Sequence, residues 1–577
     1  MAPSAPPAPT PAHDTTVDLV VVGSGTGMAA ALAAHELGLD TLIIEKTGYV
    51  GGSTARSGGA FWIPASSLLA EEGAVDTPER AGRYLRAVVD GSAPEERWAA
   101  FLSAGDETVR MLQRTTSMRF MWSKYYADYH PELPGGAATG RTCECRPFNA
   151  SVLGAERRRL RPAVLESPVP MPITGSDYKW MNLMAKVPRR GLPRVIRRAA
   201  QGIGGKLIGR EYTAGGQALA AGLYAGVLRA KIPVWTKTSI RRLTTENGRV
   251  TGVVVEQDGR EVTVGARRGV ILAAGGFDHD IAQRRKFQSE ALEPGWSFGA
   301  EGNTGDGIRV GQDVGADVDL MDQAWWFPAV APMPGRDPLV LLAERALPGS
   351  FIVDGRGQRF VNEATDYMSF GQRVLRRERD GDPVGAMWIV FDQRYRNSYV
   401  FAGAFFPRMR LPESWYKAGI AHRADDPAAL ARSVGLPVED FVDTFRRFND
   451  LASAGADDDF GRGSSAYDRY YGDPTVVPNP NLRALDGQLY AVRLVLGDLG
   501  TCGGLRADGH GRVLRSDRTP IEGLYAIGNT AANAFGTVYP GAGATIGQGI
   551  VYGLIAARHA SGAPAPAPAP ADARAAR

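Results

Sequence analysis

Residues 17–45 read VDLVVVGSGTGMAAALAAHELGLDTLIIE. An apolar run over 17–22 ends at a glycine-rich turn, an alanine-rich segment covers 28–37, and a second apolar run covers 41–45. Apolar runs of this length bounded by glycine are typical of buried parallel strands, and the segment between them has the length and composition of a helix. The stretch therefore predicts a strand–helix–strand unit with parallel strands.

The turn of this unit predicts a binding site for a dinucleotide. Glycine lets the backbone approach a pyrophosphate, and the following helix start offers free amides and positive potential. Glu45 lies 22 residues after the first turn glycine, where a carboxylate bonds ribose hydroxyls. The third glycine of the usual spacing falls one place early, so the contact between helix and strand is expected to shift. The predicted turn residues are Gly23, Ser24, Gly25, Thr26 and Gly27.

A second glycine-rich stretch, GGSTARSGG at 51–59, favours a flavin over a nicotinamide. Two glycine pairs that flank hydroxyl residues suit a backbone lying flat against a planar ring system, whereas the alternative is a flexible surface loop. No second strand, glycine turn and helix follow that could hold a nicotinamide cofactor. The sequence thus favours FAD reoxidised by an external acceptor, with contacts from Gly51, Gly52, Ser53, Thr54, Ser57, Gly58 and Gly59.

Further α/β segments occur at intervals along the chain. The pattern predicts helices and strands as follows: a helix over 217–230, a hairpin of strands 250–256 and 261–266, a buried strand over 270–274, and a strand over 523–528 before a helix over 545–557. Residues 308–498 have a different composition, which is richer in Trp, Phe, Tyr and Asp.

These segments predict an α/β fold in which a Rossmann-like FAD-binding domain is built from discontinuous pieces and carries an inserted α+β catalytic domain. The predicted divisions are an FAD-binding domain at 15–307 and 499–561, a catalytic domain at 308–498, a lid or excursion at 150–212, and disordered Pro/Ala-rich tails at 1–14 and 562–577.

Composition excludes several classes of protein. The 577 residues include 66 Lys and Arg against 62 Asp and Glu, and a net charge of +4 does not predict a nucleic-acid partner. Three cysteines do not make a disulfide framework, and the N-terminus lacks the pattern of a secretory signal, so a cytoplasmic location is expected. No apolar run approaches the ~18 residues of a membrane span. Cys143 and Cys145 have no matching second pair, and we predict no metal site.

Five motifs together carry a family resemblance. The turn with Glu45, the 51–59 stretch, Asn-Thr-Gly-Asp-Gly at 303–307, Asp-Leu-Gly-Thr at 498–501 and Tyr-Pro-Gly-Ala-Gly at 539–543 resemble the 3-ketosteroid Δ1-dehydrogenases, within the fumarate-reductase-like FAD flavoproteins. The resemblance covers nearly everything between the tails. It implies further cofactor contacts from Lys46, Ala274, Gly275, Gly276, Asp306, Gly528, Asn529, Gly543, Thr545 and Ile546.

Two positions distinguish steroid chemistry from fumarate chemistry. The fumarate-reductase relatives, which the resemblance brings in, carry one arginine after an Asn-Glu pair and another before the C-terminal glycine run, because a dicarboxylate substrate needs fixed cations. Here Asn362-Glu363 leads into Tyr367, and the later position is Tyr539. A phenol offers a hydroxyl and an aromatic face without permanent charge. The predicted substrate is therefore an uncharged, apolar carbonyl compound.

The resemblance implies a 1,2-desaturation, with a C2 proton passing to a base and a C1 hydride to flavin N5. It assigns the C3 carbonyl to the Tyr539 hydroxyl and the Gly543 amide, which precedes a helix where amides are unpaired. It assigns the base to Tyr367. Because an ordinary phenol has a pKa of about 10, that proton must be relayed or the pKa lowered. Tyr129 resembles the assisting tyrosine, and Tyr126 is the alternative.

Several alternatives remain at this stage. The runner-up activities are a fumarate or enoate reductase, a 3-ketosteroid Δ4-(5α)-dehydrogenase and a dehydrogenase of a non-steroidal cyclohexanone, and the non-enzymatic alternative is a nucleotide-fold module that binds a protein. We expect a 3-ketosteroid substrate, non-covalent FAD and an external acceptor such as a quinone.

For two further segments the sequence allows two interpretations each. The aromatic run 325–327 walls a sterol-sized pocket or belongs to the core. The basic, partly apolar stretch 193–198 makes peripheral membrane contact or is a solvated face.

Overall fold

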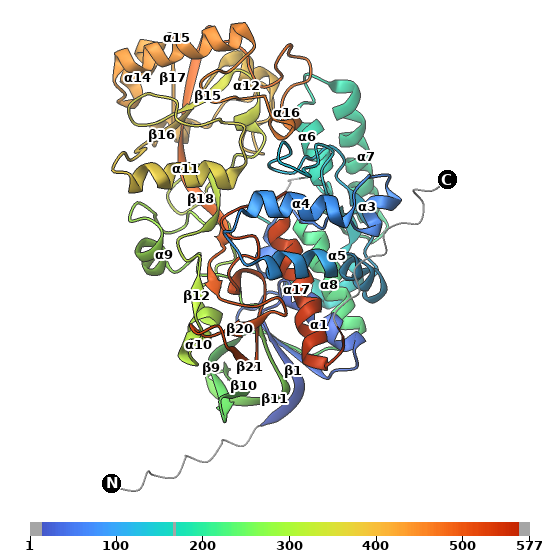
Figure 1. The fold of residues 1–577 in the computed structure, drawn as a ribbon. Coiled ribbons are helices and arrows are strands. Elements are labelled where there is room, and N and C mark those ends of the chain that lie inside the picture. The colour runs from blue at the N-terminus through green and yellow to red at the C-terminus, as the bar shows by residue number, and fades with distance from the viewer. Residues whose placement is uncertain (1–13, 165–168, 565–577) are drawn as a thin grey trace, which may run out of the picture.

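The computed structural model describes residues 14–164 and 169–564. Figure 1 shows a twisted sheet at one end of the molecule, a second sheet with its own helices at the other end, and a group of long helices beside them. The predicted tails lie outside the described residues, except for Asp14 and residues 562–564.

The first sheet has eight strands and a parallel centre. Along its main path the order is β20-β21-β11-β1-β2-β8, and an antiparallel pair, β10 and β9, extends from β11. The strands β1, β2, β8, β11 and β21 pair in parallel. Their bounds are β1 Thr15–Val22, β2 Thr41–Ile44, β8 Val234–Trp235, β9 Thr238–Glu246, β10 Arg249–Gln257, β11 Arg260–Leu272, β20 Arg512–Leu514 and β21 Pro520–Ala526.

Successive side chains of β1 are buried on opposite faces of this sheet. Leu19 and Val21 pack in the core that contains the helices α1 (Gly27–Glu36), α8 (Gly215–Arg229) and α17 (Ala544–Ser561). Val20 and Val22 pack in a second core with β9, β10 and α10 (Asp306–Asp313). Both faces are therefore covered, as the run of apolar residues predicts for parallel strands. The α/β fold class is confirmed.

One predicted boundary is wrong. The second strand of the hairpin, expected at 261–266, and the buried strand expected at 270–274 form the single strand β11. Gly269 interrupts the pattern with a φ of +131°, and the pairing of β11 with β1 shifts register at this point. A bulge of this kind bends a strand without ending it. In the sequence, the two arginines followed by a glycine look like a turn between two strands.

The second sheet has six strands and is antiparallel throughout. Its order is β14-β13-β18-β16-β15, with β17 paired to β18. The bounds are β13 Ala324–Val330, β14 Leu339–Val340, β15 Ser350–Val353, β16 Met387–Asp392, β17 Ala421–Ala424 and β18 Leu489–Thr501. Its helices are α11 Tyr367–Arg379, α12 Gln393–Ser398, α13 Glu413–Lys417, α14 Pro427–Val434, α15 Val438–Ala454 and α16 Ala466–Tyr470. The strand β18 runs from this sheet toward the first, so it connects the two regions (Figure 1).

Shorter elements complete the described chain. Three small sheets are formed by β3 Ala60–Trp62 with β5 Thr142–Cys145 and β4 Phe120–Trp122, by β6 Phe148–Asn149 with β7 Tyr212–Thr213, and by β12 Val318–Asp319 with β19 Gly504–Leu505. Apart from α6 (Gly175–Asn182) and α7 (Pro188–Leu207), the other described α-helices are α2 Gly52–Arg56, α3 Ser67–Glu71, α4 Pro78–Val89, α5 Glu95–Thr115 and α9 Ile281–Phe287, and the described 3₁₀ helices are η1 Ala150–Arg159, η2 Glu344–Ala346 and η3 Gly528–Thr530.

The Arg- and Pro-rich stretch 150–212 is mainly helical in its described part. After η1 it forms a helix pair, α6 (Gly175–Asn182) and α7 (Pro188–Leu207), beside α16 in Figure 1. Among the described residues no helix is both long and apolar enough to span a bilayer.

Candidate active site

The glycine-rich turn connects β1 to α1 as predicted. Gly23 has a φ of +112°, and a Cβ there would lie 2.1 Å from the carbonyl oxygen of Ala273, so only glycine fits. A Cβ at Gly27 would lie 2.9 Å from the Val21 side chain, and Met28 is fully buried. The early third glycine therefore makes the close helix–strand contact itself. The start of α1 has no side-chain cap, which leaves its amides available to an anion.

Glu45 closes the turn from the neighbouring strand. Its carboxylate accepts bonds from the Ser24 amide and hydroxyl and from the Thr47 amide, the last at 2.8 Å. The next residue, Lys46, pairs with Asp306 at 2.7 Å and brings the 303–307 motif to the end of β2. Lys46 and Asp306 also line a cavity of about 430 Å³ at this edge of the sheet. This edge is where an adenosine ribose would lie in a Rossmann-like site.

The 51–59 stretch forms the short helix α2, which lies over the same edge of the sheet. Ser53 Oγ accepts bonds from the Ala300 amide and the Asn303 side-chain amide, both at 2.9 Å, which ties α2 to the 303–307 motif. A Cβ placed at Gly58 would meet no atom within 4 Å, whereas one at Gly52 would contact the Gly25 backbone at 3.6 Å. Open space therefore borders the backbone at Gly58, in the second of the two glycine pairs where a flat ring system is expected to lie.

The remaining predicted cofactor residues gather at the ends of β11 and β21. The Thr530 hydroxyl donates to the carbonyl oxygen of Gly275 at 2.9 Å, and the Thr545 hydroxyl donates to the Asn529 side chain at 3.2 Å. Ile546 is buried in the first turn of α17. Segments that are far apart in sequence thus form one track from the Lys46 edge to the start of α17, and the track holds Ala274, Gly275, Gly276, Gly528, Asn529, Thr545 and Ile546. An extended dinucleotide fits this set of donors and open backbone.

Three of the predicted catalytic residues meet at the end of this track. The ring centroids of Tyr129, Tyr367 and Tyr539 are 5.2–5.5 Å apart pairwise. Tyr367 is the first residue of α11, whereas Tyr539 lies in the loop before α17. Trp325 packs on Tyr539 at 4.7 Å and Phe327 on Tyr367 at 4.6 Å. Trp325 and Phe327, which share one face of β13, therefore contact the tyrosine cluster, and the whole aromatic run is also part of the buried core.

Gly543 brings a backbone donor to the same place. It precedes α17 with a φ of +89°, and a Cβ would lie 2.3 Å from the Ala60 backbone. Its N–H donates to the Tyr539 hydroxyl oxygen at 3.2 Å. A phenol and a helix-start amide therefore converge on one point, an arrangement that suits an oxygen gaining negative charge.

Burial raises the pKa values of the site phenols. It raises the pKa of Tyr539 to about 12, partly offset by hydrogen bonds from Tyr367 and the Gly543 amide. Burial, followed by the nearby Tyr539, holds the pKa of Tyr367 well above its ordinary value. Burial likewise raises the pKa of Tyr129, whose hydroxyl faces the hydroxyls of Tyr126 and Tyr367. Burial therefore raises and does not lower the pKa of Tyr367, the predicted base, which favours the relay route for its proton.

A second layer of tyrosines surrounds these rings, and all of it except Tyr126 escaped the sequence analysis. Tyr126 lies 6.5 Å from Tyr129 and does not contact the other two site phenols; it stacks on Tyr470 at 4.6 Å. Tyr467 contacts Tyr129 at 4.7 Å, and Tyr471 contacts Tyr126 at 5.5 Å. Among the two assisting candidates, Tyr129 is the one in contact with Tyr367. The one sequence feature that could have pointed to this layer is the run Tyr-Asp-Arg-Tyr-Tyr at 467–471, but it matches no known motif among those described above.

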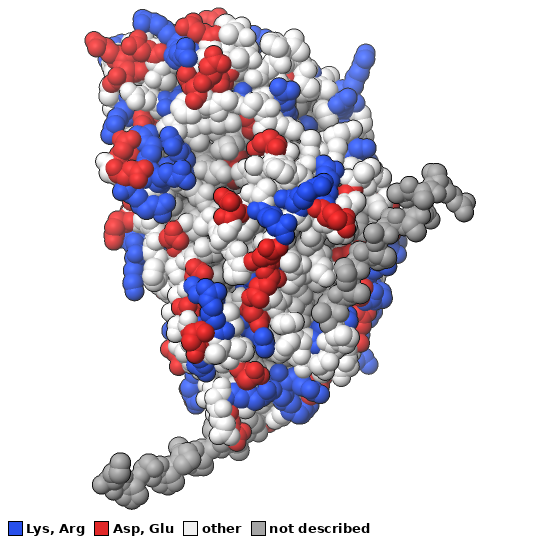
Figure 2. Space-filling view, viewed as in Figure 1, with Lys and Arg blue, Asp and Glu red and all other residues white. Residues whose placement is uncertain are grey.

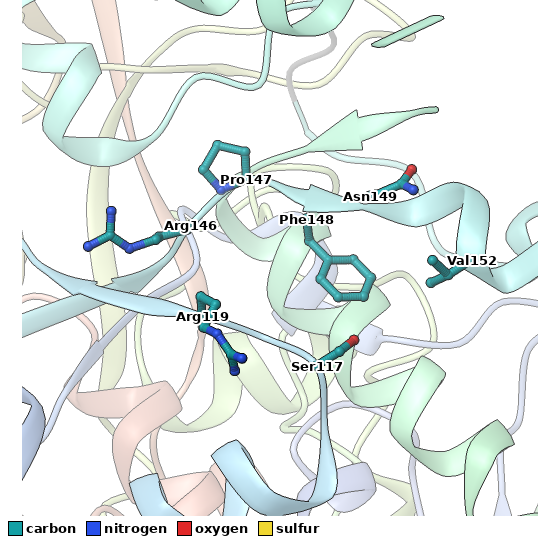
Figure 3. A pocket seen from close by; sticks show the side chains of 7 residues that line it. All are labelled: Ser117, Arg119, Arg146, Pro147, Phe148, Asn149 and Val152. Atoms are coloured by element: carbon teal, nitrogen blue, oxygen red, sulfur yellow. The ribbon is translucent and has the colours of Figure 1, made fainter. Parts of the chain in front are cut away.

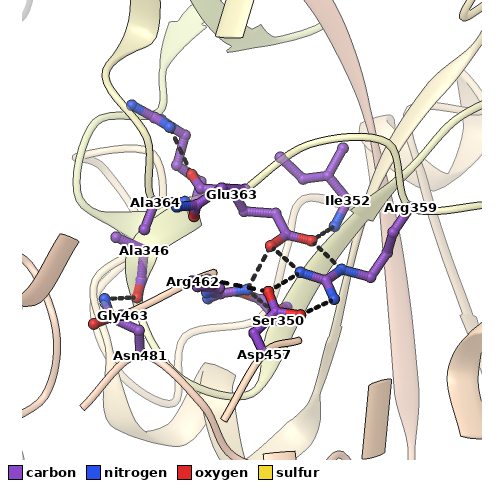
Figure 4. A network of polar contacts seen from close by, with 12 residues as sticks. Ala346, Ser350, Ile352, Arg359, Glu363, Ala364, Asp457, Arg462, Gly463 and Asn481 are labelled. Atoms are coloured by element: carbon purple, nitrogen blue, oxygen red, sulfur yellow. Dashed lines mark hydrogen bonds and ion pairs between the residues drawn. The ribbon is translucent and has the colours of Figure 1, made fainter. Parts of the chain in front are cut away.

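A buried ionic network positions the start of α11 (Figure 4). The Glu363 carboxylate accepts from Arg359 at 2.8 Å, from Arg462 at 3.1 Å and from the Ile352 amide at 3.1 Å. Arg359 also pairs with Asp457 at 2.8 Å. The Asn362-Glu363 pair is therefore structural here: it fixes the segment that leads into Tyr367.

A pair of buried carboxyl groups lies between the 274–276 and 498–501 segments. Asp498 is paired with Arg284 at 2.8 Å, whereas Asp278 accepts from Asn303 at 3.1 Å and has one oxygen without a partner among the described residues. Burial and the neighbouring Asp498 raise the pKa of Asp278 to about 6. This pair was not predicted, because Asp278 and Asp498 are 220 residues apart in the sequence.

Two other features lie outside the site. A surface cavity of about 210 Å³ (Figure 3) contains none of the predicted site residues; it is lined by Ser117, Arg119, Arg146, Pro147, Phe148, Asn149 and Val152. Cys143 and Cys145 are buried in β5, and burial raises the pKa of the Cys145 thiol to about 12. Among the described residues no group of three metal-ligating side chains converges.

Comparisons with known proteins identify the family. A family model described as an FAD binding domain matches residues 18–546. A 3-oxosteroid 1-dehydrogenase of Mycolicibacterium smegmatis is 42% identical over 552 residues, covering 94% of this chain and 96% of that protein. A 4-oxocyclohexanecarboxylate 2-dehydrogenase of Sinomonas cyclohexanicum is 35% identical, covering 95% and 93%.

A solved structure agrees with these relatives. The crystal structure of 3-ketosteroid Δ1-dehydrogenase from Sterolibacterium denitrificans, in complex with 1,4-androstadiene-3,17-dione, matches with a TM-score of 0.89 at 35% identity and covers 95% of this chain and 100% of that chain. The chain is therefore an FAD-dependent oxidoreductase of the class that carries this FAD-binding domain. Within that class it belongs to the family of the 3-oxosteroid 1-dehydrogenases, as the motifs indicated.

Proposed function

We propose that this enzyme introduces the C1–C2 double bond into a 3-ketosteroid. The observation that carries the proposal is the contact of three phenols, Tyr129, Tyr367 and Tyr539, beside the Gly543 amide. Within the described ranges, no Lys or Arg side chain lies over any of these three rings. Such a site offers hydroxyls and apolar walls to a neutral ketone, and no cation stacked on its three rings to a dicarboxylate.

The carbonyl of the substrate is held by Tyr539 and Gly543. Their donor atoms are 3.2 Å apart, so both can bond one carbonyl oxygen when it displaces the bond between them. Because the pKa of Tyr539 is raised to about 12, this phenol stays protonated at neutral pH and can donate. Polarising the carbonyl acidifies the C2 hydrogen and stabilises the enolate that its loss creates.

Tyr367 takes the C2 proton, and Tyr129 assists it. A phenol with a raised pKa is a poor base unless its own proton leaves as the new one arrives. The Tyr129 ring contacts Tyr367, and its hydroxyl faces those of Tyr367 and Tyr126, so Tyr129 can accept that proton while its own leaves through Tyr126 toward solvent. The bound FAD, which we propose is non-covalent, supplies the acceptor for the hydride that leaves C1.

The electrons pass onward to an external acceptor, for which a quinone is the proposed class. A cytoplasmic location is part of the same proposal. The three cysteines are unpaired and buried, which fits a reducing compartment.

The test is a substrate comparison on the purified holoenzyme. With an electron-accepting dye, androst-4-ene-3,17-dione is expected to be oxidised to the 1,4-diene, whereas 4-oxocyclohexanecarboxylate is expected to react poorly because no cation meets its carboxylate. Consumption of a reduced dye with fumarate, without steroid oxidation, would overturn the proposal. With 5α-androstane-3,17-dione, the position of the new double bond, read by NMR, separates 1,2- from 4,5-desaturation.

A further inference from the structure

A buried arginine lies between two aspartates from separate segments of the chain. Arg141 is fully buried, and its guanidinium donates two bonds of 2.8 Å to Asp76 and a further bond to Asp128. It also donates to the carbonyl oxygen of Gly135 at 2.8 Å. Asp76 lies just before α4, whereas Asp128 lies in the segment between β4 and β5. These three charged residues, 76, 128 and 141, are called the Arg141 triad below.

Burial distinguishes this triad from the other charged groups of the surface. Charged side chains of both signs are spread over the face of the molecule in Figure 2, and ion pairs at such exposed positions stabilise little because water screens them. By contrast, the side chains of Arg141 and Asp128 have no exposed surface, and that of Asp76 is 5% exposed. Removal of one member would leave a buried charge without its partner. The three groups therefore hold one another in place.

Asp128 stands in the sequence between the two candidates for the assisting tyrosine. Its carboxylate accepts from the indole N–H of Trp62 at 2.9 Å and from the Ala137 amide at 3.0 Å, in addition to Arg141. Both carboxylate oxygens are therefore occupied, and none of these three donors is a tyrosine hydroxyl. Asp128 thus acts on the backbone that carries Tyr129 and not on the Tyr129 hydroxyl.

Trp62 joins this carboxylate to the loop 539–543, which supplies the carbonyl donors. Its main-chain N–H donates to the carbonyl oxygen of Gly543 at 3.2 Å, and a Cβ at Gly541 would lie 2.4 Å from its indole ring. The same residue therefore contacts the loop through its backbone and ring, and the neighbour of Tyr129 through its Nε1.

A direct bond also links the two loops that carry catalytic tyrosines. The Tyr129 amide donates to the carbonyl oxygen of Pro540 at 3.1 Å, and the Tyr84 hydroxyl donates to the same oxygen at 2.6 Å. The Arg141 guanidinium lies over the Tyr84 ring, 5.4 Å from its centroid. Because Pro540 follows Tyr539 in the chain, these bonds set the spacing of the Tyr129 and Tyr539 rings, whose centroids are 5.2 Å apart.

The loop before Tyr129 needs such restraint because its backbone is strained. Tyr125 has a φ of +70°, a conformation that bulky residues rarely adopt. Strained residues of this kind persist only where the surrounding contacts over-determine them. The Tyr125 amide donates to Thr139 at 2.8 Å and the Asp128 amide to Ala137 at 3.1 Å, so the segment that leads to Arg141 holds the loop from one side. Loss of the triad would release that segment and the loop together.

We propose that the Arg141 triad is a positioning device for the reaction: it fixes Tyr129 against the loop 539–543, so that the proton relay is aligned when the ketone binds. The proposal rests on the assisting role of Tyr129 in the proposed function. Because the triad acts through Tyr129, its loss should cost no more than loss of the Tyr129 hydroxyl. A misplaced relay group lowers the rate of the chemical step, whereas the donors that bind the ketone stay where they are.

The test is single-turnover flavin reduction by androst-4-ene-3,17-dione in the full-length holoenzyme. Asp128→Asn should lower this rate by about five- to tenfold and Asp76→Asn by about two- to threefold, with less than about a twofold change in the KM of the steroid. Arg141→Lys retains the charge but not the planar fork, so it should behave like Asp76→Asn.

Matched controls come from a second, largely buried pair at the end of β16. Arg483 donates to both carboxylate oxygens of Asp392, at 2.7 and 2.8 Å, and neither residue contacts the tyrosine cluster through a hydrogen bond or ion pair recorded between described residues. Asp392→Asn and Arg483→Lys should therefore lower the melting temperature without changing the rate of flavin reduction.

A double-mutant cycle shows whether the triad acts through Tyr129. In the Tyr129→Phe background, Asp128→Asn should lower the rate by less than about twofold, because the hydroxyl to be positioned is already gone. An equal loss in both backgrounds overturns the proposal. A wild-type rate in Asp128→Asn, with only the melting temperature lowered, also overturns it and makes the triad a purely structural feature. Asp76→Asn serves in the same cycle if Asp128→Asn does not fold.

Hydrogen exchange tests the positioning without any steroid. Exchange of the amides of 125–129 should rise by about tenfold or more in Asp128→Asn, whereas that of the amides of 367–371 in α11 should stay as in the wild type. Unchanged exchange at 125–129 overturns the proposal. If exchange responds as expected but the wild-type enzyme oxidises no steroid, the positioning of Tyr129 stands and only the proposed function fails.

Discussion

The cofactor track and the tyrosine cluster adjoin each other at the start of α17 but are assembled differently. Most of the predicted cofactor contacts come from residues 23–59, where neighbouring strands and turns place them near one another in sequence, and the rest of the track comes from 274–276, 528–529 and 543–546. The cluster draws its rings from 126–129, 367, 467–471 and 539. In the track, backbone conformation carries the function, whereas in the cluster side-chain packing carries it. The two regions should therefore fail in different ways when they are altered.

The largest effect is expected in the cluster, from Tyr367→Phe. Removal of the hydroxyl that takes the C2 proton should lower the rate of flavin reduction by about 10²–10⁴ without loss of the cofactor. Single-turnover stopped flow, which follows flavin bleaching, measures this step. Tyr490→Phe, on β18 and bonded to Gln488 and Gln393, is the control. Bleaching at the wild-type rate would assign the base to another residue.

Tyr539→Phe should follow with a loss of about 10²–10³ in kcat, the usual effect of removing one oxyanion donor. The Gly543 amide remains, so some polarisation of the carbonyl survives. Steady-state turnover of androst-4-ene-3,17-dione is the measurement. Near-normal kcat in this variant would mean that the carbonyl binds elsewhere.

In the track, Gly23→Ala should act on stability and flavin retention instead of on the chemical step. The new Cβ would meet the Ala273 carbonyl oxygen at 2.1 Å in addition to the strained φ. Gly73→Ala is matched, because its φ is +86° and its Cβ would meet nothing within 4 Å. We expect about 1–2 kcal/mol of destabilisation for the control and about 3 kcal/mol or more, with loss of flavin absorbance, for Gly23→Ala. Equal flavin content in both would contradict the assignment.

Tyr129→Phe and Tyr126→Phe test which of the two tyrosines assists Tyr367. Of these two tyrosines only Tyr129 has a ring contact with Tyr367, and the two hydroxyls face each other, so its replacement should cost about tenfold in flavin reduction, the value of one hydrogen bond. Tyr126→Phe should cost less, because it acts through Tyr129. The reverse order, measured in the same stopped-flow assay, would make Tyr126 the assisting residue.

The smallest effect concerns the buried pair beside the track. Burial and Asp498 raise the pKa of Asp278 to about 6, above its ordinary 3.8. The charged form is therefore disfavoured in the folded protein above pH 6, and this penalty disappears as the pH falls toward 4. Asp278→Asn should raise stability by about 1–3 kcal/mol at pH 8 and by less at pH 4. Denaturant unfolding at both pH values measures it; an equal change at both would exclude titration as the cause.

Much of the fold was predictable, and the exceptions have physical causes. The β1–α1–β2 unit follows from apolar runs and glycines that act over a few residues. The break predicted within β11 was wrong because a bulge at Gly269 looks like a turn in sequence. The divisions at 307/308 and 498/499 stay predictions. The positions of Tyr367, Tyr539 and Gly543 followed from motif resemblance, but their mutual contact could not be read from spacing.

The sequence by itself determined the nucleotide-binding unit, the flavin and the replacement of arginines by tyrosines, because each is written in residues close together or in a motif. Only the tertiary structure determined which tyrosines touch, that Asp278 faces Asp498 and that α7 turns its leucines and isoleucines outward. Contacts between distant segments depend on how whole sheets and helices pack, and a helix's apolar stripe is the same in sequence whichever way it faces. The fold alone decides whether that stripe meets the core or the solvent.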